Sequence, residues 1–300
     1  MLRKDTFTGK GQQFAGLLSH FWGQAQLPTQ RRSFPIGRCN ARSSCEYGVV
    51  PYVDIAGHQT WHEVTGDGPP VVLLHGGFSG ASAFFAQTPV IAQAGYRVHI
   101  PERRGHAHTP DIAGPLTYSV MADDTIAYLE AQVTGPAALI GWSDGAVVAL
   151  LVAQHRPELV DRMVLIGQYY NSAGRAPDDQ FEALLASLEA GNVLRAGYDP
   201  FSPDGPEHFP VVYAKTMEMM RTEPEIDLAV LADVHVPTLV LQGDRDLVTV
   251  KHSAAVVAAL PDARLAILPG THGLPVESPD TVNPLLLAFL RQGTAVQSIV

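Results

Sequence analysis

Short apolar runs alternate with helical patterns along most of the chain, and this alternation limits the possible folds more than any other feature. Residues 71–74 read Val-Val-Leu-Leu, a β-branched run that is apolar at every position. Such runs are typical of strands buried on both faces of a sheet. Further strand candidates are 49–55, 60–64, 97–100, 137–140, 162–166, 238–241 and 264–268. Helical spacing covers 81–94, 118–133, 145–154 and 281–291. The pattern predicts an α/β fold with a mostly parallel, twisted sheet and helices on both faces.

Three parts of the chain differ in pattern. Residues 49–167 and 237–300 carry the alternation and form the predicted core. Residues 168–236 hold helix-like pieces at 178–190 and 206–221 but no convincing core strand, which predicts a helical lid inserted between two strands. Residues 1–48 hold seven Lys or Arg and two acids, hence a net charge of +5, whereas the whole chain carries −10. We expect this basic N-terminal extension to be disordered or loosely packed.

The extension also bears on localisation. Arg31-Arg32-Ser33-Phe34 resembles part of a twin-arginine export signal, but the residues that follow, 35–42, are not apolar. Arg-rich, acid-poor segments also occur in organelle-targeting peptides. We expect a cytoplasmic protein and leave export or organelle targeting by residues 1–48 open. The longest unbroken aliphatic run, 146–153, is too short to cross a bilayer, so no membrane span is expected.

The amino-acid composition argues against several classes of binding partner. The net charge of −10 argues against nucleic acid. The only cysteines, Cys39 and Cys45, lie in the extension, which argues against a disulfide framework or a Cys-based zinc site in the core. His106 and His108 have no nearby run of further ligands, so we expect no metal site. A small-molecule substrate is the expected partner, and the oligomeric state is left open.

The pentapeptide Gly141-Trp142-Ser143-Asp144-Gly145 fits the pattern G-x-S-x-G. It follows the strand candidate 137–140 and precedes the helix candidate 145–154, as a nucleophile elbow requires. The two glycines allow a tight turn that lifts the Ser143 hydroxyl above the sheet, at a helix N-terminus that favours negative charge. Ser143 is therefore the predicted nucleophile.

A glycine-rich loop follows the first core strand. His75-Gly76-Gly77-Phe78 begins where the run 71–74 ends. A backbone N–H of Gly77 or Phe78, together with the N–H of Asp144, could form an oxyanion hole for acyl transfer.

From about residue 50 to 292 the chain resembles the α/β-hydrolase superfamily. The segment 141–146 is similar to the G-W-S-D-G-G elbow of the valacyclovir-hydrolase-like group, with Ala146 at the last glycine. The loop 101–107 resembles the superfamily's D-x-R-G-H-G segment, with Glu102 at the Asp position and Ala107 at the last glycine. The resemblance implies the α/β-hydrolase fold.

The resemblance also implies a chain order of nucleophile, acid and histidine. Residues 239–246 end in Gly-Asp-Arg-Asp, where the family pattern G-x-x-D selects Asp246 and leaves Asp244 as the alternative acid. His272 follows the last strand candidate and is the expected base. The implied activity is that of a serine hydrolase with a catalytic triad, which needs no cofactor.

The substrate is less constrained. In the valacyclovir-hydrolase-like group the Asp of the elbow receives a substrate α-amino group, and the resemblance would give this role to Asp144. The alternative is that its carboxylate caps the helix that it begins or pairs with a neighbouring base. Aromatic neighbours of the motifs could form an apolar pocket wall or belong to the core: Phe78, Trp142, Tyr169 and Tyr170, with Leu274 beside them. We expect the protein to hydrolyse a small carboxylic ester. A second interpretation keeps the same triad but applies it to a lactone, an amide or a C–C bond, or to peracid formation as in a perhydrolase. A third interpretation is a ligand receptor without catalytic activity.

Overall fold

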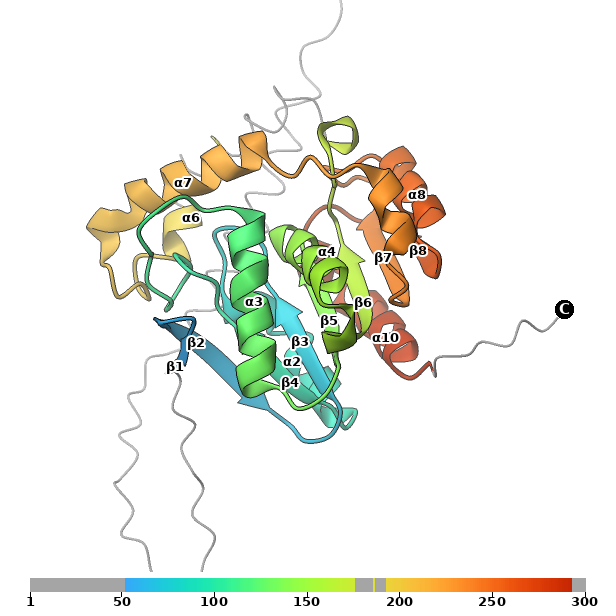
Figure 1. Ribbon diagram of the computed structural model, residues 1–300, viewed down its shortest axis with the longest axis horizontal. Coiled ribbons are helices and arrows are strands. Elements are labelled where there is room, and N and C mark those ends of the chain that lie inside the picture. Colours follow the sequence, from blue (N-terminus) through green and yellow to red (C-terminus); the bar gives the residue numbers. More distant parts are fainter. Residues whose placement is uncertain (1–51, 176–185, 187–192, 293–300) are drawn as a thin grey trace, which may run out of the picture.

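A computed structural model describes residues 52–175, 186 and 193–292. These residues contain one eight-stranded sheet of order β1-β2-β4-β3-β5-β6-β7-β8 (Figure 1). The strands are β1 Tyr52–Ile55, β2 His58–Thr65, β3 Pro70–Leu74, β4 Arg97–Pro101, β5 Ala137–Trp142, β6 Val160–Ile166, β7 Thr238–Gly243 and β8 Ala263–Leu268. β2 pairs antiparallel with β1 and β4, whereas all other pairs are parallel. The predicted mostly parallel sheet is confirmed.

Helices cover both faces of this sheet. The α-helices are α2 Thr88–Gln93, α3 Tyr118–Gln132, α4 Asp144–His155, α6 Val193–Ala196, α7 Phe209–Thr222, α8 Val250–Ala259, α9 Leu274–Glu277 and α10 Pro279–Leu290. Short 3₁₀ helices are η1 Ala81–Phe84, η2 Pro157–Leu159, η3 Ser172–Gly174, η4 Pro206–His208 and η5 Leu228–Asp233.

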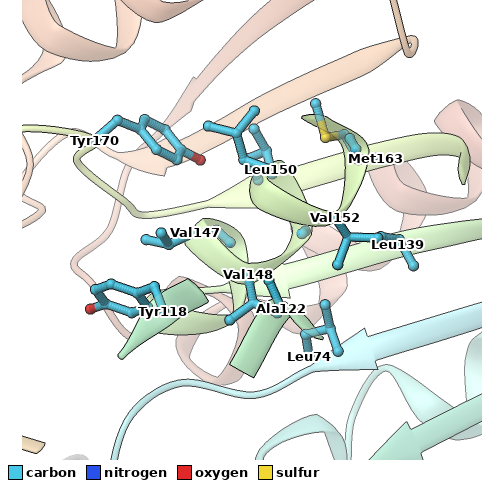
Figure 2. Close-up of a cluster of buried hydrophobic side chains, with 14 of the residues drawn as sticks. Leu74, Tyr118, Ala122, Leu139, Val147, Val148, Leu150, Val152, Met163 and Tyr170 are labelled. Atoms are coloured by element: carbon cyan, nitrogen blue, oxygen red, sulfur yellow. The ribbon is translucent and has the colours of Figure 1, made fainter. Parts of the chain in front are cut away.

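Successive strand residues point to opposite faces, so each core strand feeds two clusters of buried side chains. Val72 and Leu74 of β3 pack with α3, α4 and α8 on one face. Figure 2 shows Leu74 with side chains of α3 and α4 in this cluster. Val71 and Leu73 pack with α2, α9 and α10 on the other. This double burial explains why the core strands read as continuous apolar runs rather than as alternating ones.

Two predictions of local structure need correction. The single helix expected over 81–94 is wrong: the chain forms η1, then a separate helix α2 with Pro89 in its first turn. Proline lacks an N–H and suits the start of a helix rather than its interior. The sequence reading also missed α8, although Thr249 caps it by accepting a hydrogen bond from the His252 N–H.

Between β6 and β7 the described residues form helices joined by loops and turns, and they take part in no strand pairing apart from an isolated bridge between Arg175 and Val248. The longest helix among the described residues of this segment, α7, runs across one end of the sheet (Figure 1). There Tyr213 stacks on Phe78 of the loop after β3, with ring centroids 5.6 Å apart. The predicted helix 178–190, apart from residue 186, and the extension 1–48 lie outside the described residues. The lid interpretation therefore stays a prediction.

A buried carboxylate ties α7 to the core. Asp111, in the loop after β4, accepts hydrogen bonds of 2.7 and 2.9 Å from Lys215 Nζ and one of 2.8 Å from His208 Nε2. Burial acts to raise the pKa of Asp111, but the hydrogen bonds from Lys215 and His208 outweigh it and lower the pKa overall. The paired, ionised carboxylate therefore holds α7 and η4 against the loop.

We expect Lys215→Met to loosen this attachment. The change leaves a buried carboxylate with one partner fewer, which should destabilise the fold by about 1–3 kcal/mol and lower the melting temperature by several degrees. Thermal unfolding measures the effect. Lys251→Met, at an exposed position on α8, is the matched control. Equal melting temperatures for the two variants would show that Asp111 does not fasten α7.

Candidate active site

Ser143 stands at a strained turn between β5 and α4. Its φ of 54° and ψ of −124° are unusual for a residue with a side chain. The glycines on either side explain how so sharp a turn fits. A Cβ on Gly145 would lie 1.9 Å from the Leu74 carbonyl oxygen, and one on Gly141 would lie 2.2 Å from the Gly145 carbonyl oxygen. Only glycine allows the backbones to approach this closely.

The structure brings His272 and Asp246 to Ser143. His272 Nε2 lies 3.0 Å from Ser143 Oγ, and His272 Nδ1 lies 2.8 Å from Asp246 Oδ1. The carboxylate of Asp246 is 1% exposed. The alternative acid, Asp244, is 52% exposed and instead accepts a hydrogen bond of 2.9 Å from the Gly270 N–H. Of the two acids, Asp246 is therefore the partner of His272.

The surroundings of His272 bias its proton affinity. Burial acts to lower the pKa of His272, but the charge and hydrogen bond of Asp246 raise it, and the charges of Asp144 and Glu277 add to this. The net result is a raised pKa. A neutral ring that donates from Nδ1 to Asp246 leaves Nε2 free of a proton and able to accept one from the Ser143 hydroxyl.

Two sources of backbone N–H groups lie beside Ser143. Asp144 begins α4, so its N–H has no acceptor within the helix. The loop after β3 passes close by, because a Cβ on Gly76 would lie 3.2 Å from Ser143 Cβ. Phe78, farther along that loop, has a φ of 54°. The arrangement brings the predicted donors, Asp144 and Gly77 or Phe78, to the same region as the Ser143 hydroxyl.

Asp144 is 2% exposed, and its surroundings act on the pKa of its carboxyl group in opposite directions. The Tyr118 hydroxyl donates a 2.7 Å hydrogen bond to its Oδ1, whereas Oδ2 accepts none from the described residues. A Cβ on Gly77 would lie 2.6 Å from that Oδ2. Burial raises the pKa of Asp144, although Arg103, Tyr118 and His272 act to lower it. The sequence reading missed Tyr118 and Arg103, for which local pattern offers no signal.

The aromatic residues next to the motifs were expected either to line a pocket or to belong to the core. Trp142 belongs to the core cluster and donates its indole N–H to the His272 carbonyl, 2.9 Å away, so it supports the histidine loop. Tyr170 is also buried in the core (Figure 2), and its ring stacks on that of His252. Leu274 is buried in the core as well. Tyr169 lies near enough to Asp144 that burial and this charge raise its pKa to about 12.

Within the described residues, no group of three or more His, Cys, Asp or Glu side chains could hold a metal ion. His106 is buried, which lowers its pKa to about 3, and His108 pairs with Glu102 at 3.0 Å. Over the same part of the chain, no helix is both long and apolar enough to span a membrane.

The chain is similar to known proteins along most of its length. Residues 71–285 match the Alpha/beta hydrolase family. Pyrrolizixenacetamide deacetylase from Xenorhabdus hominickii is 26% identical over 261 residues, which cover 79% of this chain and 97% of that protein. Non-heme haloperoxidase from Rhodococcus erythropolis is 25% identical over 279 residues, covering 80% and 99%. A solved serine hydrolase involved in carbazole degradation has a TM-score of 0.68 at 24% identity, covering 80% and 97%. The predicted α/β-hydrolase fold is confirmed.

The raised pKa of His272 leads to a pH test. Ester turnover that needs neutral His272 should lose kcat/KM on the acid side, with a midpoint above the ordinary histidine value of 6.5. Asp144→Asn and Glu277→Gln each remove a negative charge that raises this pKa, so both should move the midpoint down. The measurement is kcat/KM against pH with a neutral ester.

Asp262→Asn is the matched control, because Asp262 is exposed and is not among the charges that act on His272. It should leave the midpoint unchanged. A midpoint that is the same in all four proteins would contradict this account of His272.

Proposed function

The chain belongs to the Alpha/beta hydrolase family, and from this premise we propose that it hydrolyses a small carboxylic ester through an acyl-enzyme on Ser143. The observation that carries the proposal is the hydrogen-bonded line of Ser143 Oγ, His272 and Asp246, with distances of 3.0 and 2.8 Å. A nucleophile, a base within hydrogen-bond reach and a buried acid that orients the base are the three groups that acyl transfer requires.

The reaction divides into two steps. In the first, His272 Nε2 takes the Ser143 proton as Oγ attacks the carbonyl carbon, and the Asp144 N–H with that of Gly77 or Phe78 stabilises the oxyanion. The imidazolium, stabilised by Asp246, then protonates the leaving alcohol. In the second step, His272 takes a proton from water, the hydroxide attacks the acyl carbon, and the proton returns to Ser143 Oγ as the acid leaves.

Ser143→Ala should abolish ester turnover, because no other group in the line can attack the carbonyl. We expect kcat to fall by about 10⁴-fold or more with the fold intact, as measured by steady-state kinetics and thermal unfolding. The matched control is Ser82→Ala at an exposed position. Activity of the Ser143 variant within about tenfold of wild type would disprove the assignment.

We further propose that the preferred ester carries an α-amino group, received by Asp144. Support comes from the resemblance of the elbow to the valacyclovir-hydrolase-like group and from the chemistry of the carboxylate. Asp144 is adjacent to Ser143 in the chain and buried, and its Oδ2 accepts no hydrogen bond from the described residues. A substrate ammonium would give this oxygen a charge-assisted partner.

Asp144→Asn tests this preference, since it keeps the backbone N–H and removes the charge. We expect kcat/KM to fall by at least about tenfold, or about 1.4 kcal/mol, for α-amino esters and to change little for neutral esters of similar size. The comparison is made at a pH above the acid limb, where His272 is neutral in both proteins. Equal losses for the two substrate types would make Asp144 a structural carboxylate.

Other acyl chemistries are compatible with the same triad. The relative from Xenorhabdus hominickii is named a deacetylase and the one from Rhodococcus erythropolis a haloperoxidase. A panel of neutral esters, aminoacyl esters, N-acetyl amides, a lactone and a C–C-cleavable diketone, together with peracid formation from acetate and peroxide, separates these alternatives. The ester proposal requires the highest Ser143-dependent kcat/KM on an ester.

A further inference from the structure

The carbonyl oxygen of Gly76 accepts three hydrogen bonds from side chains. The donors are His75 Nδ1 at 2.8 Å, Ser79 Oγ at 2.8 Å and Arg103 Nη2 at 2.9 Å. A carbonyl oxygen has two lone pairs, so three donors surround it fully. The charged donor, Arg103, makes the strongest of such bonds. The Gly76–Gly77 peptide is therefore held on its carbonyl side.

Two of the contacts of His75, one at each ring nitrogen, assign the position of its proton. The Arg103 backbone N–H donates to His75 Nε2 at 3.1 Å, which requires Nε2 to be without a proton. The ring proton then resides on Nδ1 and points at the Gly76 oxygen. Arg103 Nη2 lies 3.2 Å from the same Nδ1, but two donors face each other there, so its hydrogen bond goes to the Gly76 oxygen. Burial and the charge of Arg103 lower the pKa of His75 well below its usual range, so the ring stays neutral. Arg103 thus holds Gly76 directly through its side chain, and its backbone N–H orients the His75 ring that also binds the Gly76 oxygen.

Holding this carbonyl has a consequence for the other side of the peptide. In a trans peptide the C=O and the following N–H point in opposite directions. The Gly76 oxygen faces Arg103, so the Gly77 N–H faces away from it. Gly76 lies against Ser143, since a Cβ there would be 3.2 Å from Ser143 Cβ and 3.8 Å from Oγ. A rotated peptide would present a carbonyl oxygen instead of an N–H to this region.

We propose that Arg103 is a positioning residue for the oxyanion hole: it locks the Gly76–Gly77 peptide so that the N–H groups of the loop face the carbonyl oxygen under attack at Ser143. This inference rests on the proposed function of Ser143. Arginine suits the role because its guanidinium stays charged even when buried. Asp144, whose charge acts on Arg103, partly offsets the cost of burying that charge.

The neighbouring arginine provides a matched control. Arg104 lies in the same loop and forms two hydrogen bonds of 2.6 Å with Asp124, from Nε and Nη2. No hydrogen bond within the described residues connects its side chain to residues 75–78. A change at Arg104 therefore tests the general effect of removing a paired, largely buried arginine from this loop.

The experiment compares Arg103→Met, Arg103→Lys and Arg104→Met with wild type, on a neutral ester so that amine binding by Asp144 plays no part. Loss of one oxyanion-hole donor costs about 10²–10³ in kcat, so we expect Arg103→Met to lower kcat by at least about 30-fold with KM within about threefold. Arg103→Lys, which keeps the charge and one donor, should recover part of the loss. Arg104→Met should affect thermal stability more than kcat.

The affinity for a transition-state mimic distinguishes the two possible roles of Arg103, because a residue that only stabilises the fold would leave this affinity unchanged. A trifluoromethyl ketone that adds to Ser143 places an oxyanion in the hole, so its affinity should fall in parallel with kcat/KM in the Arg103 variants. Unchanged ketone affinity, or kcat within threefold of wild type in both Arg103 variants, overturns the inference. If Arg103→Met does not fold, Arg103→Lys decides by the same criteria. Persistent activity of Ser143→Ala would instead overturn the proposed function.

Discussion

The close approach of α4 to the end of β3 is the constraint on which the rest of the site depends. A Cβ on Gly145 would lie 1.9 Å from the Leu74 carbonyl oxygen, so glycine alone permits this approach beside the sharp turn at Ser143. The turn costs backbone strain at Ser143, of about 1–3 kcal/mol. Burial of α4 between β5 and α3 outweighs this cost, because nine of its residues are buried. The strained turn brings the serine to the loops that follow β3, β7 and β8.

Buried charged groups connect these loops through hydrogen bonds and electrostatic interactions. Asp246 and Asp144 both act on His272, and Arg103 acts on both Asp144 and the Gly76 carbonyl. Each charge has at least one hydrogen-bonded partner, which limits the cost of removing it from water. A substitution at one of these residues should therefore be felt at the others, and such effects should not be additive.

The departures from the family's D-x-R-G-H-G segment have local explanations. Glu102 replaces the aspartate, and its buried carboxylate accepts hydrogen bonds from the N–H groups of Ala81, at 2.9 Å, and His108, at 2.7 Å. Ala107 stands at the last glycine position and has a φ of 44°, a conformation that glycine adopts with less strain. The longer acidic side chain thus joins η1 to the loop that carries Arg103.

The buried strands follow from the sequence alone, because a run of apolar residues between helices has one favourable environment, the interior of a sheet covered on both faces. The sequence also indicated Ser143, Asp246 and His272 through motif and chain order. The helical periodicity of 81–94 predicted one continuous helix there despite Pro89, which was wrong, and no helix was predicted at the position of α8. The contact of His272 with Asp246, which the family pattern had favoured over Asp244, is seen only in the folded chain, as are the bonds of Tyr118 to Asp144 and of Arg103 to Gly76. These contacts join residues 26 to 27 positions apart, and strand register and loop path, not local sequence, bring them together.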